Sequence, residues 1–125
     1  MSAAPLKADR PWPTELRLRK SARVLEVDFD DGHSFTLPAE LLRVESPSAE
    51  VQGHGASQKK TVPGKRTVGI ERIEPVGTYA VRLVFSDGHD TGLFTWDYLH
   101  ELGEKADEKM TAYLTALEEK GLSRD

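Results

Sequence analysis

The chain has 125 residues, of which 38% are hydrophobic and 30% are charged, a balance typical of a single globular domain. Its net charge of −4 argues against nucleic acid or an anionic membrane as a partner. It contains no cysteine, which excludes disulfides, thiolate nucleophiles and cysteine-ligated metal centres. No apolar run approaches the roughly 20 residues that span a bilayer, and the start of the chain lacks the apolar stretch of a signal peptide. We therefore expect a cytoplasmic protein.

The first part of the chain predicts an arm, strands and a short helix. Residues 1–13 contain three prolines and no periodicity, which indicates a flexible arm. Alternation of apolar and polar residues predicts strands over 15–19, 25–29 and 34–37. Asp31-Gly32 separates the last two strands and favours a hairpin turn, because both turn positions must tolerate positive φ. Pro38 then opens a short helix over 39–43.

A long polar segment, 44–66, divides the chain and is typical of a functional or disordered loop. Beyond it, the pattern predicts strands over 68–74, 81–85 and 91–94, with a second hairpin turn at Asp87-Gly88. A helix over 96–102 follows, which Gly103 ends. An apolar stripe predicts a last helix over 104–120.

These elements predict an α+β fold: a small, mainly antiparallel sheet built from two β-hairpins plus an added strand, packed with short helices and a C-terminal helix. Three regions follow: the arm (1–13), the domain (14–103) and the C-terminal helix with its tail (104–125). Residues 27–33 and 83–89 are similar in sequence, since both end in Asp-Gly-His and both precede a predicted strand and helix. Two explanations of this similarity are open: independent selection of Asp-Gly for a hairpin turn, and internal duplication.

Histidines and carboxylates form one candidate site. His54 lies between two glycines, where the backbone can approach a ligand closely, and His89 follows the second hairpin turn. Because imidazole and carboxylate suit zinc or iron, one hypothesis combines these histidines with Glu50, Asp90 or Glu45 as metal ligands. The competing interpretation makes His89 a turn residue whose ring bonds to its neighbours.

Three other features have both a functional and a structural interpretation. Ser46 or Ser48 would need a general base and an oxyanion hole to act as a nucleophile, and otherwise shapes the turn after the helix. Lys59 and Lys60 belong to a basic cluster that would bind an acidic partner or remain solvated. Trp96 would be a core residue or, if exposed, part of a partner surface.

Five short motifs follow one another in a distinctive order: Leu42-Arg43, Ser46-Pro47-Ser48-Ala49-Glu50, Gly53-His54-Gly55, Asp87-Gly88-His89-Asp90 and Trp96-Asp97-Tyr98-Leu99. In combination they resemble the gamma-butyrobetaine hydroxylase-like N-terminal domain family, over about Thr14 to Gly103. That family includes stand-alone bacterial proteins of uncharacterised function.

The resemblance implies a zinc site that this chain has lost. In the full-length hydroxylases, the domain binds structural zinc through a Cys-Pro-Cys-x-x-Cys segment and a later histidine. Aligned on the preceding Leu-Arg, Ser46, Ser48 and Val51 stand at the cysteine positions, and His89 stands at the histidine position. Since a structural zinc site needs four ligands, we expect no zinc site of the family type and no cofactor.

Related domains occur fused to P-loop iron–sulfur carrier ATPases, so the resemblance implies a protein partner of that kind. We expect a non-catalytic accessory module that binds a partner. A metal-binding protein is the first alternative, and a hydrolase or oxygenase fragment is the second. The residues expected to contact the partner are Ser46, Ser48, His54, Lys59, Lys60, His89 and Trp96.

Overall fold

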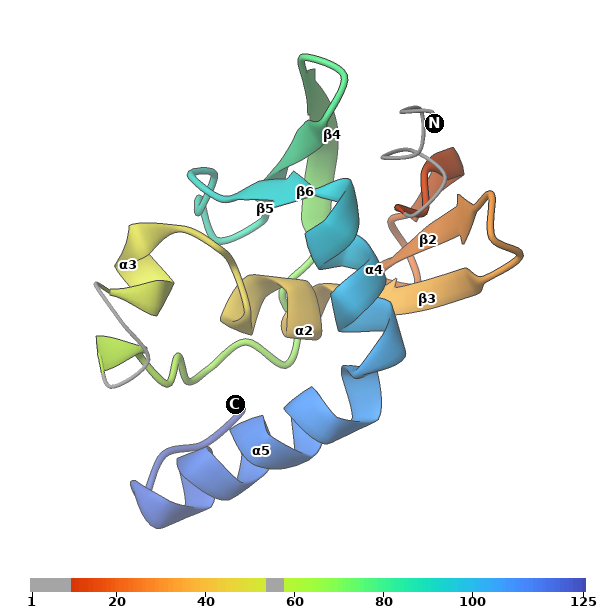
Figure 1. Ribbon diagram of the computed structural model, residues 1–125. Coiled ribbons are helices and arrows are strands. Elements are labelled where there is room, and N and C mark those ends of the chain that lie inside the picture. The colour runs from red at the N-terminus through yellow and green to blue at the C-terminus, as the bar shows by residue number, and fades with distance from the viewer. Residues whose placement is uncertain (1–9, 54–57) are drawn as a thin grey trace.

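The computed structural model describes residues 10–53 and 58–125, whose strands form two three-stranded antiparallel sheets (Figure 1). The first sheet, in the order β1-β2-β3, contains β1 (Pro13–Arg19), β2 (Val24–Phe29) and β3 (Ser34–Pro38). The second sheet, in the order β4-β5-β6, contains β4 (Ile70–Val76), β5 (Ala80–Phe85) and β6 (Leu93–Thr95). The helices are α2 (Ala39–Val44), α3 (Ala49–Gln52), α4 (Trp96–Glu104) and α5 (Ala106–Glu119).

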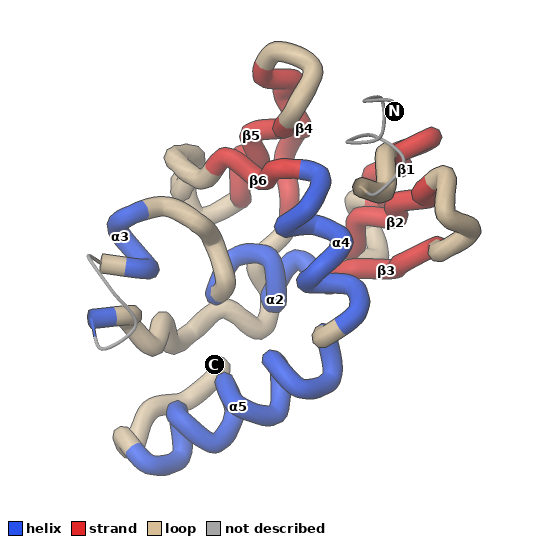
Figure 2. Tube along the Cα trace, in the orientation of Figure 1, coloured by secondary structure: helices blue, strands red, loops and turns tan. Residues whose placement is uncertain are grey.

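The expected α+β fold, with antiparallel strands, short helices and a C-terminal helix, is confirmed. Each run of three strands completes its own sheet, so the strands are divided between two sheets (Figure 2). Periodicity predicted the individual strands, but it carries no information on which strands share a sheet. No helix among the described residues is long and apolar enough to cross a membrane.

Two predicted boundaries were wrong. The arm was expected to extend to residue 13, but Pro13 already pairs with Phe29, and the Trp12 N–H donates to Asp30 Oδ1 at 3.0 Å. Residues 1–9 of the expected arm lie outside the described residues. Gly103 was expected to end a helix, but α4 continues through it to Glu104. Lys105 then separates α4 from α5.

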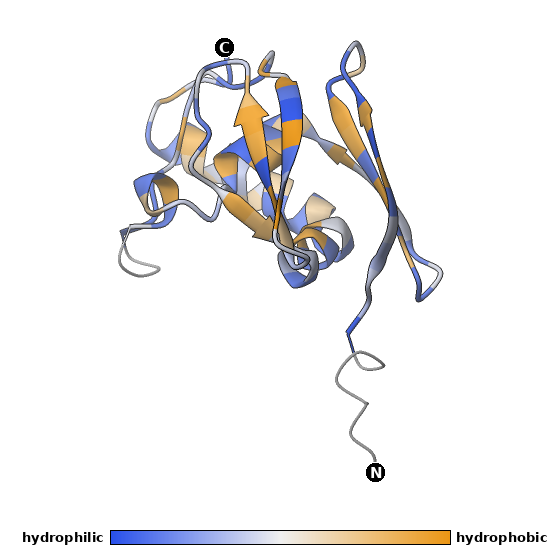
Figure 3. Ribbon diagram, turned by 90° about the horizontal axis from the view of Figure 1, so that it is seen from above, coloured by the Kyte–Doolittle hydropathy of each residue, from blue (hydrophilic) through white to orange (hydrophobic). Residues whose placement is uncertain are grey.

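Both sheets and the two central helices share one apolar core. Residues from β2, β3, β5, β6, α2 and α4 are all buried there; they include Leu25, Val27, Leu37, Leu42, Leu83, Phe85, Phe94, Leu99 and Leu102. Hydrophobic and polar residues are interspersed along the strands (Figure 3). In β2 every second residue is buried, so Leu25, Val27 and Phe29 lie on the face of the strand that meets the core.

A second, smaller core joins α5 to α2. Val44, Tyr113 and Leu117 are buried together, and the Tyr113 hydroxyl donates to the Val62 carbonyl at 2.5 Å. The C-terminal tail then returns beside this helix (Figure 1), where Arg124 donates two hydrogen bonds to the buried Glu40 carboxylate at 2.9 and 2.6 Å. The C-terminal region is therefore attached to the rest of the domain by packing and by an ion pair.

The order of three strands and a helix occurs twice, as β1-β2-β3-α2 and as β4-β5-β6-α4. Gly32 and Gly88 have φ of 91° and 92° in the two hairpin turns, a conformation that favours glycine. In each turn the aspartate Oδ1 accepts a hydrogen bond from the N–H of the histidine two residues later, at 2.9 Å from His33 and at 3.0 Å from His89. The two turns thus share one geometry.

The helices extend this correspondence beyond the turns. Arg43, the fifth residue of α2, donates to Oδ2 of Asp87 in the second hairpin at 2.8 Å. His100, the fifth residue of α4, lies 2.8 Å from Oδ2 of Asp31 in the first hairpin. Each helix therefore contacts the hairpin of the other half. Turn chemistry alone does not account for this exchange, which favours internal duplication.

Candidate functional site

The structure brings four of the predicted site residues into one polar cluster. Ser46 Oγ lies 2.9 Å from His89 Nε2, and His89 Nδ1 lies 3.1 Å from Glu50 Oε1. Ser48 Oγ accepts from the Glu50 N–H at 3.1 Å and lies 2.8 Å from Thr91 Oγ1. The segment after α2 and the turn after β5, 43 residues apart in sequence, meet in this cluster.

Burial lowers the pKa of His89, with the positive charge of Arg43 acting in the same direction. The neutral ring then donates from Nδ1 to Glu50 and accepts from the Ser46 hydroxyl at Nε2, which satisfies both nitrogens. Serine, histidine and carboxylate follow in the order of a catalytic triad. However, Ser46 has no exposed surface, and a Cβ built on Gly92 would lie 2.3 Å from its Oγ. The hydroxyl is therefore closed to a substrate.

This burial conflicts with the partner-binding role expected of these residues. Ser46, Ser48 and His89 are 0%, 7% and 8% exposed, so their side chains bond to one another instead of forming a surface. Ser48 is the N-cap of α3, and its side chain accepts a hydrogen bond from the Glu50 N–H. This confirms the structural interpretation, in which the serine hydroxyls cap backbone groups. The sequence predicted Ser46, Ser48, Glu50 and His89 as site residues, but it predicted neither Thr91 nor the burial of the cluster.

The basic and metal-binding candidates are placed differently. Lys59 donates to both oxygens of the buried Glu45 carboxylate, at 2.7 and 2.8 Å, so its charge is paired within the domain. Lys60 is exposed, and its backbone N–H donates to the Val51 carbonyl. Asp90 is half-buried after the second turn. His54 lies outside the described residues.

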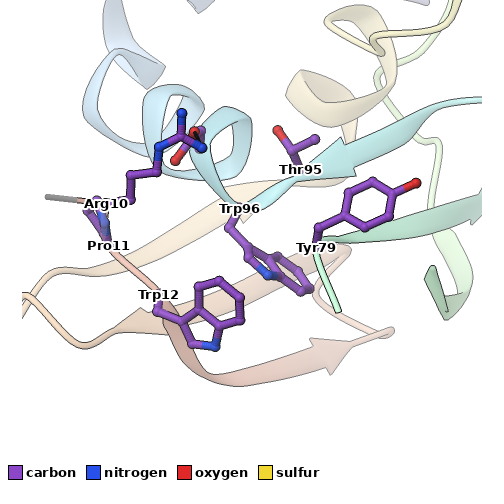
Figure 4. Close-up of a pocket in the computed structure, with 7 residues that line it drawn as sticks. Arg10, Pro11, Trp12, Tyr79, Thr95 and Trp96 are labelled. Carbon is purple, nitrogen blue, oxygen red and sulfur yellow. Dashed lines mark ion pairs between the residues drawn. The ribbon is translucent and has the colours of Figure 1, made fainter. Parts of the chain in front are cut away.

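A cleft lined by aromatic side chains lies at the N-terminal end of α4. Its cavity of about 410 Å³ is lined by Arg10, Pro11, Trp12, Tyr79, Thr95, Trp96 and Asp97. The rings of Trp12 and Trp96 meet edge to face with centroids 6.4 Å apart, and Figure 4 shows Trp96 between Trp12 and Tyr79. Sequence reasoning identified Trp96 alone, since the three aromatic residues come from distant segments.

The cleft is open, and the Trp96 ring is held in place. Tyr79 is 53% exposed and Trp12 is 37% exposed, whereas Trp96 is half-buried. The Trp96 indole Nε1–H donates to the Thr78 carbonyl at 2.9 Å, which anchors the ring to the turn between β4 and β5. An ion pair between Arg10 and Asp97, at 3.3 Å, lies at the edge of the cleft.

Comparison with known proteins identifies the family. The family described as gamma-butyrobetaine hydroxylase-like, N-terminal, matches residues 16–100. The chain belongs to this family. Among curated proteins, none matches the chain.

Solved structures support the same assignment to the gamma-butyrobetaine hydroxylase-like, N-terminal, family. Two solution NMR structures are each 47% identical to this chain. The alignment with the first has a TM-score of 0.81 and covers 93% of this chain and 91% of that structure's chain. The alignment with the second has a TM-score of 0.80 and covers 99% of this chain and 90% of that structure's chain. A crystal structure of a protein of unknown function from Acidithiobacillus ferrooxidans is 47% identical, with a TM-score of 0.62, and covers 73% of this chain and 91% of its own.

Within the gamma-butyrobetaine hydroxylase-like family, this chain departs from the zinc-binding pattern that the resemblance implies. Ser46 and Ser48 stand at two of the three cysteine positions and form neutral hydrogen bonds. Val51 stands at the third and is buried as an apolar residue. Three neutral or apolar groups and one histidine do not fit a structural zinc site. The same two segments are joined here by hydrogen bonds.

Proposed function

We propose that the protein is a non-catalytic module of the cytoplasm that binds a protein partner through the aromatic cleft. The observation that carries this proposal is the group of three aromatic rings, Trp12, Tyr79 and Trp96, around an open cavity. Tryptophan and tyrosine are enriched among the residues that contribute most to protein interfaces. The cleft replaces the polar cluster as the proposed contact surface. Trp96 is the residue that the cleft shares with the partner-contacting residues predicted from the sequence.

The chemistry of the cleft indicates what it would bind. The Trp96 N–H is already bonded to Thr78, so this indole offers its apolar face and edge to a ligand. The charges of Arg10 and Asp97 neutralise each other at the edge. An apolar aliphatic or prolyl segment fits such a surface, because aromatic-lined grooves bind extended proline-rich chains through stacked rings. The proposed ligand is therefore an uncharged, extended segment of a partner protein.

The proposed partner is a P-loop iron–sulfur carrier ATPase. Support for this partner comes from the fused relatives that the resemblance brings with it, and the cleft supplies a surface with which it would bind. The absence of cysteine from the chain means that iron–sulfur ligands would come from the partner. The module would then act on the carrier by docking.

Calorimetric titration with the purified carrier ATPase tests both parts of the proposal. We expect wild-type protein to bind, and Tyr79→Ser or Trp12→Ala to weaken binding by about tenfold or more, as for central aromatic residues of an interface. The matched control is Leu114→Ala, because Leu114 is an exposed apolar residue of α5 that does not line the cleft. Its affinity should equal that of the wild type.

The outcomes separate the partner from the surface. Absence of binding to the carrier would reject the carrier as the partner. Binding that Tyr79→Ser and Trp12→Ala both leave unchanged would reject the cleft. Labelling by a fluorophosphonate probe that Ser46→Ala abolishes would contradict the non-catalytic assignment, because it would require an accessible, activated serine.

A further inference from the structure

A second cluster, formed by an aspartate and two histidines, lies at the first hairpin turn. Asp31 Oδ2 lies 2.9 Å from His33 Nδ1 and 2.8 Å from His100 Nε2. The other oxygen of the carboxylate, Oδ1, accepts the His33 backbone N–H at 2.9 Å. One carboxylate oxygen therefore lies between two imidazole nitrogens, one from the turn and one from α4.

The two rings are held by aromatic packing. His100 is 8% exposed and meets Phe29 and Phe35 edge to face, with centroids 4.8 and 5.2 Å away. His33 stacks on Phe35 with an interplanar angle of 9°. On the other side of His100, Nδ1 lies 3.3 Å from Glu104 Oε1. The Nε2 atom of His100 is thus directed toward Asp31 before any ligand arrives.

The equivalent position in the other half of the domain shows what is different here. Asp87 Oδ2 lies 2.8 Å from Arg43 and 2.6 Å from Lys65, so permanent cations neutralise that carboxylate. At Asp31 the corresponding partners are imidazoles. Arginine and lysine cannot ligate a metal in their charged forms, whereas neutral imidazole is the commonest metal ligand. Of the two equivalent aspartates, only Asp31 is therefore surrounded by side chains that can ligate a metal ion.

We propose that Asp31, His33 and His100 bind a divalent transition-metal ion of the zinc class. One ligand atom from each residue lies within 4.8 Å of the other two. Ligand atoms of a tetrahedral zinc ion are about 3.3 Å apart, so the two short contacts to Asp31 would open by about 0.5 Å. The two imidazole nitrogens lie within 4.8 Å of each other and would approach by as much as about 1.5 Å, which the exposed His33 side chain allows. Two imidazoles and one carboxylate form a common set of three protein ligands for zinc.

The surroundings complete such a site. Glu104 lies where an outer carboxylate would hold the Nδ1–H of His100 and so fix its ring for ligation through Nε2. The side chain of His33 is 52% exposed, which leaves the fourth position open to water or to a donor from another molecule. This site is independent of the aromatic cleft and of the cluster around His89.

Zinc titration of the untagged, chelator-treated protein tests the proposal by calorimetry. We expect one equivalent to bind, with affinity reduced by about tenfold or more in His33→Ala and in Asp31→Asn, since loss of even an outer partner commonly costs that much. Asp31→Asn keeps an oxygen that accepts the turn N–H, so the hairpin is retained. Cobalt should give the visible absorption of a tetrahedral or five-coordinate centre in the wild type alone.

Glu50→Gln is the matched control, because Glu50 is an exposed carboxylate that contacts His89 in the other cluster. It should leave zinc affinity unchanged. Absence of zinc binding by folded wild-type protein would overturn the proposal. So would binding that persists in both His33→Ala and Asp31→Asn, or binding that only Glu50→Gln weakens, which would place the metal at His89.

Discussion

The ring of Phe35 fills the space in which a side chain on Gly103 would lie. A Cβ built on Gly103 would be 2.3 Å from Phe35 Cγ, well inside any allowed contact. Alanine normally stabilises a helix interior by about 1 kcal/mol relative to glycine. Here we expect Gly103→Ala to lower the free energy of unfolding by about 1–3 kcal/mol, because Phe35 must move. Urea denaturation measures the change.

The control for this prediction is Gly69→Ala. A Cβ on Gly69 would meet its nearest neighbours at 4.0 Å, so the unfolding free energy should change by no more than about 0.5 kcal/mol. A stabilised Gly103→Ala variant would show that Phe35 has room to move. It would also weaken the case that Phe35 positions the rings of His33 and His100.

Asp87 should make the protein sensitive to acid. Burial raises the pKa of its carboxyl, but hydrogen bonds from Lys65, the His89 N–H and Arg43 together hold it at about 2, against an ordinary value of 3.8. The folded state therefore favours the ionised form, and this stabilisation is present above the ordinary pKa. It is lost as pH falls from about 4 through about 2.

Asp87→Asn should therefore lose less stability than the wild type over that pH range, although it is less stable at pH 7. Urea unfolding at a series of pH values measures both effects. Asp97→Asn is the control, because the Asp97 carboxylate forms an exposed ion pair. Identical acid dependence in Asp87→Asn and the wild type would contradict the assignment.

The C-terminal tail should contribute to stability through Arg124. Glu40 is 7% exposed and receives both hydrogen bonds of the Arg124 guanidinium, so Arg124→Met leaves a buried carboxylate without its cation. We expect a loss of about 1–3 kcal/mol in the free energy of unfolding. Arg66→Met, which breaks an exposed pair with Asp125, should change it by less than about 1 kcal/mol. Equal effects of the two variants would argue against a special role for the pair of Arg124 with Glu40.

The lost zinc site can be tested by restoring its cysteines. The triple variant Ser46→Cys, Ser48→Cys, Val51→Cys should bind cobalt with the intense near-ultraviolet absorption of thiolate ligation, since His89 already faces residue 46. Thiolate absorption distinguishes this site from the cluster at Asp31. Adding His89→Ala should weaken the binding. A triple variant without thiolate absorption would show that the segment no longer has the geometry that the resemblance implies.

Sequence patterns predicted the features that neighbouring residues determine. Alternation indicated the strands, and the two Asp-Gly turns adopt the positive φ that their glycines allow. The division into two sheets and the aromatic cleft depend on which distant segments pack together, and periodicity does not encode this. His100 illustrates the limit, because it meets Asp31 across 69 residues and belongs to no local motif.

The exchange of helices between the two halves also has a consequence for how the domain folds and arose. The contacts of Arg43 with Asp87 and of His100 with Asp31 span 44 and 69 residues, so each helix finds its carboxylate only once the hairpin of the other half has formed. Folding should therefore be a single cooperative event. A solitary ancestral half would have carried a helix with no hairpin to receive it. Two copies of such a half, each placing its helix on the hairpin of the other, would complete both contacts, and fusion of the two copies would give the present arrangement.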